Sequence, residues 1–240
     1  MLVAGNWKLY KTAAETSAFC GELRRELDGV EGVQIAVCPA YTSLAAAVGA
    51  LAGTEIAVAA QNVHWSHEGA YTGEVSPAML LELGVYGAIV GHSERRQYFG
   101  ETDETVARRT LTALEAGLSV IACVGESEEE RESGQMEVVL KLQVEALADT
   151  VGAHENLVIA YEPVWAIGTG KTASPEQAQE AHAFIRSLLE VPVLYGGSVK
   201  PDNAEELLGQ ADIEGALVGG ASLEVESFAA ICRAAARVAA

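Results

Sequence analysis

The chain has 240 residues, 50% of them hydrophobic, and a formal net charge of −19. The hydrophobic content excludes a disordered chain and is enough for one large core. The negative charge repels nucleic acid and anionic lipid, so we expect neither as a partner. The same charge repels a small anion at long range, so any phosphate site must be formed locally by backbone N–H groups and one or two cations.

The four cysteines lie far apart along the chain, at positions 20, 38, 123 and 232. This spacing argues against a disulfide framework or a zinc site and favours free thiols in a reducing cytoplasm. We expect no secretory signal in the first residues. We also expect no membrane span, since no run reaches about 18 apolar residues.

Short apolar runs recur along the chain, and most are continuous rather than alternating in polarity. Such runs are typical of strands buried on both faces of a parallel sheet. They lie at residues 2–7, 33–38, 56–61, 87–91, 118–124, 157–162, 193–196 and 216–219.

Longer helical patterns separate these runs. Capping boxes are predicted at Thr12 with Glu15 and at Ser174 with Gln177. Further helices are predicted at 104–115, 137–148, 202–208 and 228–238, with weaker signals at 43–51 and 78–83. The alternation predicts one domain over residues 1–240. Its α/β fold is a (β/α)₈ barrel, with parallel strands surrounded by helices, rather than a doubly wound sheet.

Polar residues and glycine pairs follow several of the predicted strands. Barrel enzymes carry their chemistry at the carboxyl ends of the strands, so these residues are expected to converge. Glycine pairs also allow backbone N–H groups to close around an anion. The residues at the strand ends are Asn6, Lys8, His92, Glu94, Glu162, Gly196, Gly197, Ser198, Gly219 and Gly220.

Each of these residues has a simpler explanation when it is taken alone. Lys8 could be a solvated rim residue, His92 a structural histidine and Glu162 a helix cap. Their convergence on one face favours a site. The segment 168–172, GTGKT, resembles the end of a nucleotide-binding loop, but Trp165 stands where that motif requires glycine.

Five segments of the sequence are characteristic of one protein family. They are AGNWK at 4–8, VGHSERR at 90–96, YEPVWAIGTGKTA at 161–173, YGGSV at 195–199 and ALVGGASL at 216–223. In these segments, which occur in the family's order, the sequence resembles the triosephosphate isomerase family, and the resemblance covers essentially the whole chain. The resemblance implies a cytoplasmic TIM barrel enzyme of glycolysis and gluconeogenesis. Such an enzyme interconverts dihydroxyacetone phosphate and D-glyceraldehyde 3-phosphate through an enediolate, without a metal or cofactor.

The resemblance also implies catalytic roles for residues that match the motifs. Glu162 is the expected general base, and His92 is the expected electrophile at the substrate oxygens. Lys8 would offset the charge of the phosphate and the enediolate. Asn6 would hydrogen-bond to a substrate oxygen, and Glu94 would bridge the site behind Lys8.

Other matching residues are expected to bind the phosphate and to enclose the base. Ile167 and Leu217 would crowd the base, and the segment 163–173 resembles a closing lid. A helix that begins just after His92 predicts a neutral imidazole. The expected phosphate donors are the backbone N–H groups of Gly168, Ser198, Gly219 and Gly220.

The segment 61–76, from Gln61 to Ser76, has no strong helix or strand signal but carries His64, Trp65 and Tyr71. A long loop with apolar side chains is usually functional or covered by a partner. By resemblance, we expect it to dock into a second subunit of a homodimer near Asn6 and Lys8. Two other functions stay open: a barrel synthase acting on a larger sugar phosphate, and a binding protein without catalysis.

Overall fold

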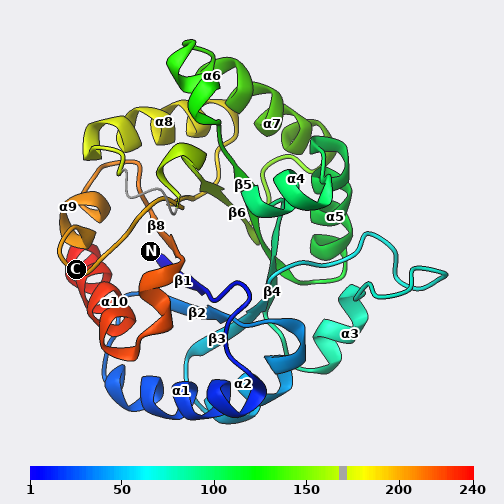
Figure 1. Ribbon diagram of the computed structural model, residues 1–240, viewed down its shortest axis with the longest axis vertical. Coiled ribbons are helices and arrows are strands. Elements are labelled where there is room, and N and C mark those ends of the chain that lie inside the picture. The colour runs from blue at the N-terminus through cyan, green and yellow to red at the C-terminus, as the bar shows by residue number, and fades with distance from the viewer. Residues whose placement is uncertain (168–171) are drawn as a thin grey trace.

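The computed structural model describes residues 1–167 and 172–240. Its strands form a closed barrel in chain order, and every neighbouring pair is parallel (Figure 1). This confirms the predicted fold class. The strands are β1 (Leu2–Asn6), β2 (Gln34–Cys38), β3 (Ile56–Ala60), β4 (Gly87–Val90), β5 (Ser119–Val124), β6 (Leu157–Tyr161), β7 (Val193–Tyr195) and β8 (Gly215–Val218).

Helices surround the barrel, as Figure 1 shows. The α-helices are α1 (Ala13–Glu26), α2 (Leu44–Leu51), α3 (Pro77–Glu82), α4 (Ser93–Phe99), α5 (Asp103–Glu115), α6 (Glu128–Glu132), α7 (Met136–Thr150), α8 (Pro175–Leu188), α9 (Ala204–Leu208) and α10 (Val225–Ala239). Short 3-10 turns are η1 (Tyr41–Ser43), η2 (Val164–Ala166) and η3 (Gly220–Leu223). None of the helices in the described ranges is long and apolar enough to cross a membrane.

The strands read as continuous apolar runs because each one is buried on both of its faces. In β5, Ile121 and Cys123 belong to the core inside the barrel, while Val120 and Val124 belong to the core between strands and helices. The inner core mixes small and large residues, which lets the side chains fill a narrow barrel. Its buried members are Ala4, Ala36, Cys38, Ala59, Ile89, Ile121, Cys123, Ala160, Leu194 and Leu217.

Local signals located most helices correctly. Both predicted capping boxes are present, at Thr12 for α1 and at Ser174 for α8. The helix α6 was not predicted, although Ser127 and Glu130 form a third capping box. This helix, EEERE, has no apolar stripe and buries none of its residues, so hydrophobic periodicity gives no signal for it.

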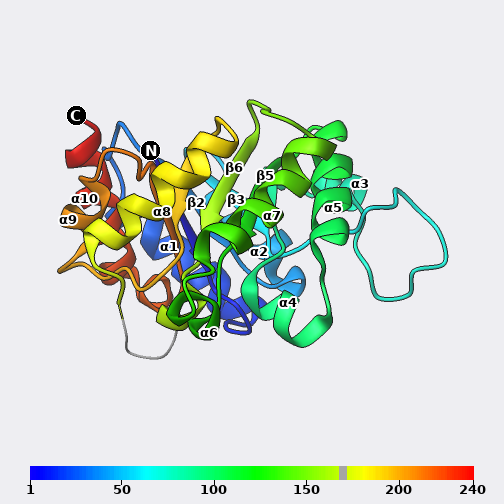
Figure 2. The same ribbon diagram turned by 90° about the horizontal axis from the view of Figure 1, so that it is seen from above.

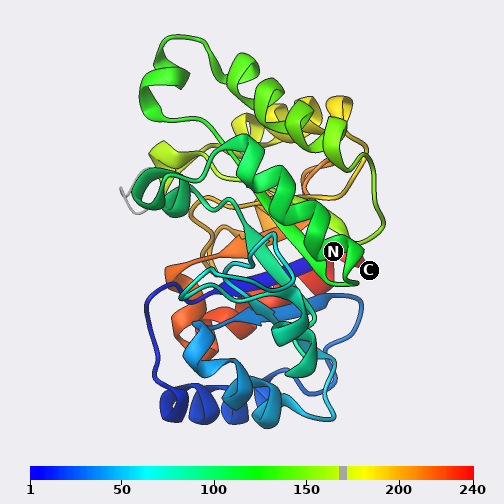
Figure 3. The ribbon, with the colours of Figure 1, turned by 90° about the vertical axis from the view of Figure 1, so that its right-hand side faces the viewer.

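The connections at the two ends of the barrel differ in length and position. Figure 2 shows the loops that follow the strands on one side and the chain termini on the other. Figure 3 shows both termini at the same end of the barrel. The segment 61–76, between β3 and α3, extends away from the barrel in Figures 1 and 2.

Candidate active site

A cavity of about 420 Å³ opens at the carboxyl end of the barrel. The strands bring together residues that are far apart in sequence, because the ends of parallel strands meet on one rim. The predicted residues Asn6, Lys8, His92, Glu162 and Ser198 all line it. The remaining lining residues are Ile167, Gly196, Gly197, Val199, Lys200, Leu217, Gly219, Gly220 and Ala221.

Glu162 and His92 form a buried pair in this cavity. Glu162 directly follows β6 and is 2% exposed, while His92 lies between β4 and α4 and is 5% exposed. His92 Nε2 lies 2.9 Å from Glu162 Oε1. The second carboxylate oxygen, Oε2, accepts a hydrogen bond from the backbone N–H of Ser93 at 2.8 Å. Both oxygens of the carboxylate are therefore occupied.

The two groups shift each other's proton affinity. Burial by itself raises the pKa of Glu162, but His92 and the Ser93 N–H outweigh burial and hold that pKa below its ordinary value. Burial by itself lowers the pKa of His92, but the Glu162 carboxylate outweighs it and raises that pKa. The carboxyl group is consequently ionised at neutral pH.

The surroundings of the imidazole also indicate its tautomer. His92 is the N-cap of α4, and its Nδ1 accepts the backbone N–H of Glu94 at 3.2 Å. An accepting Nδ1 carries no proton, so the proton lies on Nε2 and faces Glu162. The helix end favours a neutral His92 while the carboxylate favours a charged one, and the neutral imidazole stays a prediction.

Lys8 is held from several sides at the edge of the cavity. Its Nζ donates to Glu94 Oε1 at 2.7 Å, and its backbone N–H donates to Asn6 Oδ1 at 3.1 Å. Glu94 itself lies one step back, in a neighbouring cavity of about 720 Å³ that Lys8 and Asn6 also line. Glu94 therefore lies behind Lys8 as seen from the first cavity, and its role in the site stays a prediction.

The ends of β7 and β8 leave open space on the other side of the cavity. A Cβ atom built on Gly220 would meet nothing within 4 Å, and one on Gly219 would meet Lys8 Cε at 3.5 Å. Space beside the backbone here belongs to the cavity, so a ligand can approach the peptide groups closely. Ile167 and Leu217 also line the cavity. Gly168 lies outside the described residues.

The segment that follows Glu162 is anchored to the barrel in its described part. Trp165 Nε1 donates to Glu126 Oε1 at 3.0 Å, and the Tyr161 hydroxyl donates to the same oxygen at 3.0 Å. Ser198 Oγ donates to the carbonyl of Ala166 at 3.0 Å. Residues 163–167 therefore connect the base to both β7 and the buried Glu126.

Two groups that were not predicted contact the predicted residues. Ser93 donates its backbone N–H to the Glu162 carboxylate. Every residue except proline has such a group, so the residue type does not predict the contact. Gln61 follows β3 and donates to the carbonyl of Lys8 at 2.8 Å. Gln61 stands at the end of a predicted apolar run, as Asn6 does, so the same strand-end criterion predicts it.

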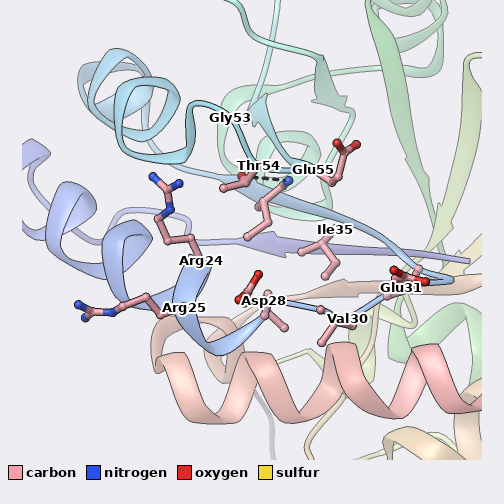
Figure 4. Close-up of a pocket in the computed structure, with 13 residues that line it drawn as sticks. Arg24, Arg25, Asp28, Val30, Glu31, Ile35, Gly53, Thr54 and Glu55 are labelled. Atoms are coloured by element: carbon pink, nitrogen blue, oxygen red, sulfur yellow. Dashed lines mark hydrogen bonds between the residues drawn. The ribbon is translucent and has the colours of Figure 1, made fainter.

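A second pocket, of about 580 Å³, lies outside the barrel near the start of β2 and the loop before β3. Figure 4 shows Arg24 and Arg25 at one end of it, and Glu31 and Glu55 at the other. Arg24 Nη1 donates to the carbonyl of Ala50. In the described part of the chain no ion pair joins these groups. This pocket therefore offers no buried acid–base pair comparable to Glu162 and His92.

Comparison with known proteins gives a uniform result. The family model described as Triosephosphate isomerase matches residues 1–235. The triosephosphate isomerase of Carboxydothermus hydrogenoformans is 54% identical over 243 residues, covering 96% of this chain and 97% of its own. The enzyme of the same name from Solibacter usitatus is 54% identical over 242 residues, covering 96% and 97%. That from Geotalea uraniireducens is 51% identical over 244 residues, covering 97% of each chain.

Proposed function

The chain belongs to the triosephosphate isomerase family, and from this premise we propose how its residues share the reaction. The reaction interconverts dihydroxyacetone phosphate and D-glyceraldehyde 3-phosphate, an aldose–ketose isomerisation in glycolysis and gluconeogenesis. One proton moves between neighbouring carbons through an enediolate. The observation that carries the assignment of roles is the buried Glu162–His92 pair at the carboxyl end of the barrel.

Glu162 is the proposed general base. Its contacts with His92 and the Ser93 N–H keep its carboxylate ionised while no substrate is bound. A substrate that draws the carboxylate away from these donors removes the contacts that lower its pKa, while burial, which raises it, persists. Substrate binding would therefore strengthen the base at the moment when it has to take a proton from carbon.

His92, Asn6 and Lys8 are the proposed partners of the substrate oxygens. The proton on His92 Nε2 can be donated to a carbonyl or enediolate oxygen once Glu162 has moved. A carboxylate base beside a neutral histidine is the chemistry already known for this family, and we assign it to these two residues. The Lys8 ammonium, oriented by Glu94, supplies positive charge for the phosphate and the enediolate.

Backbone N–H groups at Ser198, Gly219 and Gly220 are the proposed phosphate donors, together with Gly168. A net charge of −19 repels a dianion at long range, so a preorganised local site is needed. The open space beside Gly219 and Gly220 supports this assignment, because a phosphate can reach the peptide groups without a clash.

An assay with D-glyceraldehyde 3-phosphate, coupled to detection of dihydroxyacetone phosphate, tests the function. The matched control is Glu162→Gln purified in the same way, which separates this chain's activity from that of a contaminating host enzyme. We expect rapid turnover by the wild-type chain and almost none by the variant. No turnover of either triose phosphate by the wild type would refute the function.

We further propose that residues 61–76 dock into a second copy of the chain and form a homodimer. His64 stacks on Trp65 and lies at a tilt against Tyr71, with ring centroids 4.3 Å apart in each case, so aromatic side chains within the loop pack against one another. The neighbouring cavity beside Lys8 is bordered by Leu9, 94% exposed, and Phe99, 68% exposed. Exposed apolar side chains that gather around one cavity in this way are typical of a protein–protein contact surface.

The substitution Tyr71→Asp tests the dimer, because it places a charge on the half-exposed tip of the loop. We expect sedimentation to find a monomer and the assay to find little activity. Leu142→Asp, on the exposed face of α7, is the matched control and should leave both unchanged. A fully active monomer would overturn the proposal.

The segment 163–173 is proposed to close over bound substrate, and Trp165 reports this. Closure that moves the indole away from Glu126 would break their 3.0 Å hydrogen bond. With Trp7 and Trp65 replaced by Phe, we expect the remaining fluorescence to change when a phosphate-bearing transition-state analogue binds. An unchanged spectrum at saturation would argue against closure at this position.

The cellular setting is proposed from the cysteines. All four cysteines are free and buried, which suits a protein of the reducing cytoplasm.

A further inference from the structure

The backbone of Lys8 has an unusual conformation for a residue with a side chain. Its φ angle is +51°, in the left-handed region that L-residues rarely adopt. Such a conformation persists only where surrounding contacts impose it. Lys8 lines the cavity beside His92 and Glu162, so the groups that impose this conformation also set the position of the ammonium.

The side-chain amide of Gln61 is one of these groups. Its Nε2 donates one hydrogen bond to the carbonyl of Lys8 at 2.8 Å and another to the carbonyl of Cys38 at 2.9 Å. Cys38 ends β2, Gln61 follows β3 and Lys8 follows β1. A single NH₂ group therefore ties together the ends of three neighbouring strands.

The two hydrogen bonds of this amide differ in whether the accepting carbonyl has another donor. The Cys38 carbonyl also accepts the backbone N–H of Trp7 at 3.2 Å, so it keeps a partner without Gln61. For the Lys8 carbonyl, Gln61 is the donor found within residues 1–167 and 172–240. The bond that depends on Gln61 is consequently the one to Lys8.

Three contacts then fix Lys8. Asn6 accepts its backbone N–H, Gln61 donates to its carbonyl, and Glu94 accepts from its ammonium. The first two constrain the peptide groups on either side of the strained φ angle. The third fixes the charge at the far end of the side chain.

We propose that Gln61 is a positioning residue, which holds the left-handed backbone of Lys8 so that its ammonium faces the substrate. The proposal rests on the role given to Lys8 in the proposed function. Gln61 does not touch the substrate in this scheme. Glutamate at this position would turn an oxygen toward two carbonyl oxygens, and methionine of similar length would donate to neither.

The experiment is a double-mutant cycle of Gln61→Met with Lys8→Met in the coupled assay. In the otherwise wild-type chain, we expect kcat/KM to fall roughly 10²-fold, since misplacing a charged group by about 1 Å can cost that much. In the Lys8→Met chain, the same change should cost less than about 2-fold, because residues that act through one another are not additive.

Gln179 offers a matched control, because its amide also makes two hydrogen bonds. It donates to Asp212 Oδ2 and accepts the Asp212 backbone N–H at 2.9 Å, joining α8 to the turn before β8. We expect Gln179→Met to lower the thermal midpoint without changing kcat/KM. If Gln61→Met fails to fold, Gln61→Asn, one methylene shorter, takes its place in the cycle.

Calorimetry with inorganic phosphate separates failure of this proposal from failure of the isomerase function. If the wild-type chain shows no turnover but binds phosphate, weaker binding by Gln61→Met than by Gln179→Met still supports the positioning role. A folded Gln61 variant with wild-type kcat/KM would overturn it. An equal loss with and without Lys8 would also overturn it, because Gln61 would then act on something else.

Discussion

The two ends of the barrel are built from the same strands but differ in how deeply charged side chains are buried. At the carboxyl end, Glu162 and His92 are almost completely buried and contact each other. Beyond the other end of the strands, Arg25, Glu31 and Glu55 border the pocket of Figure 4 and remain exposed. Burying a charge is costly unless it is paired and hydrogen-bonded. The carboxyl end bears this cost, which supports our proposal that the reaction takes place there.

The largest expected effect comes from shortening the base. Glu162→Asp retracts the carboxylate by about 1 Å, and misplacement of that size can lower kcat roughly 10²-fold. The matched change Glu55→Asp, at the exposed pocket, should leave kcat unchanged. Steady-state kinetics of both variants decide the point. If Glu162→Asp retains wild-type kcat, Glu162 is not the base.

Replacing one glycine at each end of the barrel should separate an effect on stability from an effect on catalysis. A Cβ on Gly125 would lie 1.8 Å from the carbonyl oxygen of Glu162, and a Cβ on Gly215 would lie 1.9 Å from that of Leu2. Either change to alanine forces the backbone apart, at a cost of roughly 3 kcal/mol. Thermal unfolding should find both variants destabilised.

Activity should then distinguish these two variants. Gly125→Ala displaces the residue that carries the base, so we expect its kcat to fall at temperatures where it is fully folded. Gly215→Ala disturbs β1 and β8 at the amino end, so its kcat should stay near that of the wild type. Equal kcat values for the two variants would show that the two ends do not differ in their effect on catalysis.

The Glu162–His92 contact predicts a pH effect of intermediate size. The carboxylate raises the pKa of His92, so nitrogen-15 NMR should find that Glu162→Gln lowers the pH at which the imidazole gains its second proton. In Glu162→Gln, burial and the start of α4 remain, and the imidazole should stay neutral down to pH 5. His182 is an internal control, because burial lowers its pKa to about 4. An unchanged His92 midpoint in the variant would contradict the pairing.

The same pair contributes to stability within a limited pH range. A raised pKa of His92 stabilises the fold below the unfolded value of about 6.5, and this contribution fades as pH rises through the folded value. A lowered pKa of Glu162 stabilises the fold above the unfolded model value of 4.5, and this contribution fades as pH falls through the folded value. Glu162→Gln should therefore cost most stability between about pH 4.5 and 6.5.

The smallest effect is expected at the exposed pocket. Arg25 makes no ion pair among the described residues, and its side chain is exposed. Arg25→Ala should change the free energy of unfolding by less than about 0.5 kcal/mol and leave kcat/KM unchanged. A large loss of activity would give this pocket a function that its geometry does not indicate.

Local features of the sequence determined the barrel and much of the site. Continuous apolar runs predicted strands buried on both faces, and Thr12 and Ser174 marked helix starts, because burial and capping depend on residues close together in the chain. The strand-end rule found Asn6, Lys8 and Glu162, since parallel strands end on one rim. The roles of these residues, and one domain over residues 1–240, stay predictions.

The tertiary structure alone decided which side chains meet. Ser93 and Glu162 are 69 residues apart, and their hydrogen bond exists because barrel closure brings β4 and β6 to one cavity. The left-handed backbone of Lys8 and its contact with Gln61, 53 residues away, have no signature in sequence spacing. Periodicity reports which face of an element is buried, whereas the direction of a side chain across the cavity depends on packing between distant segments.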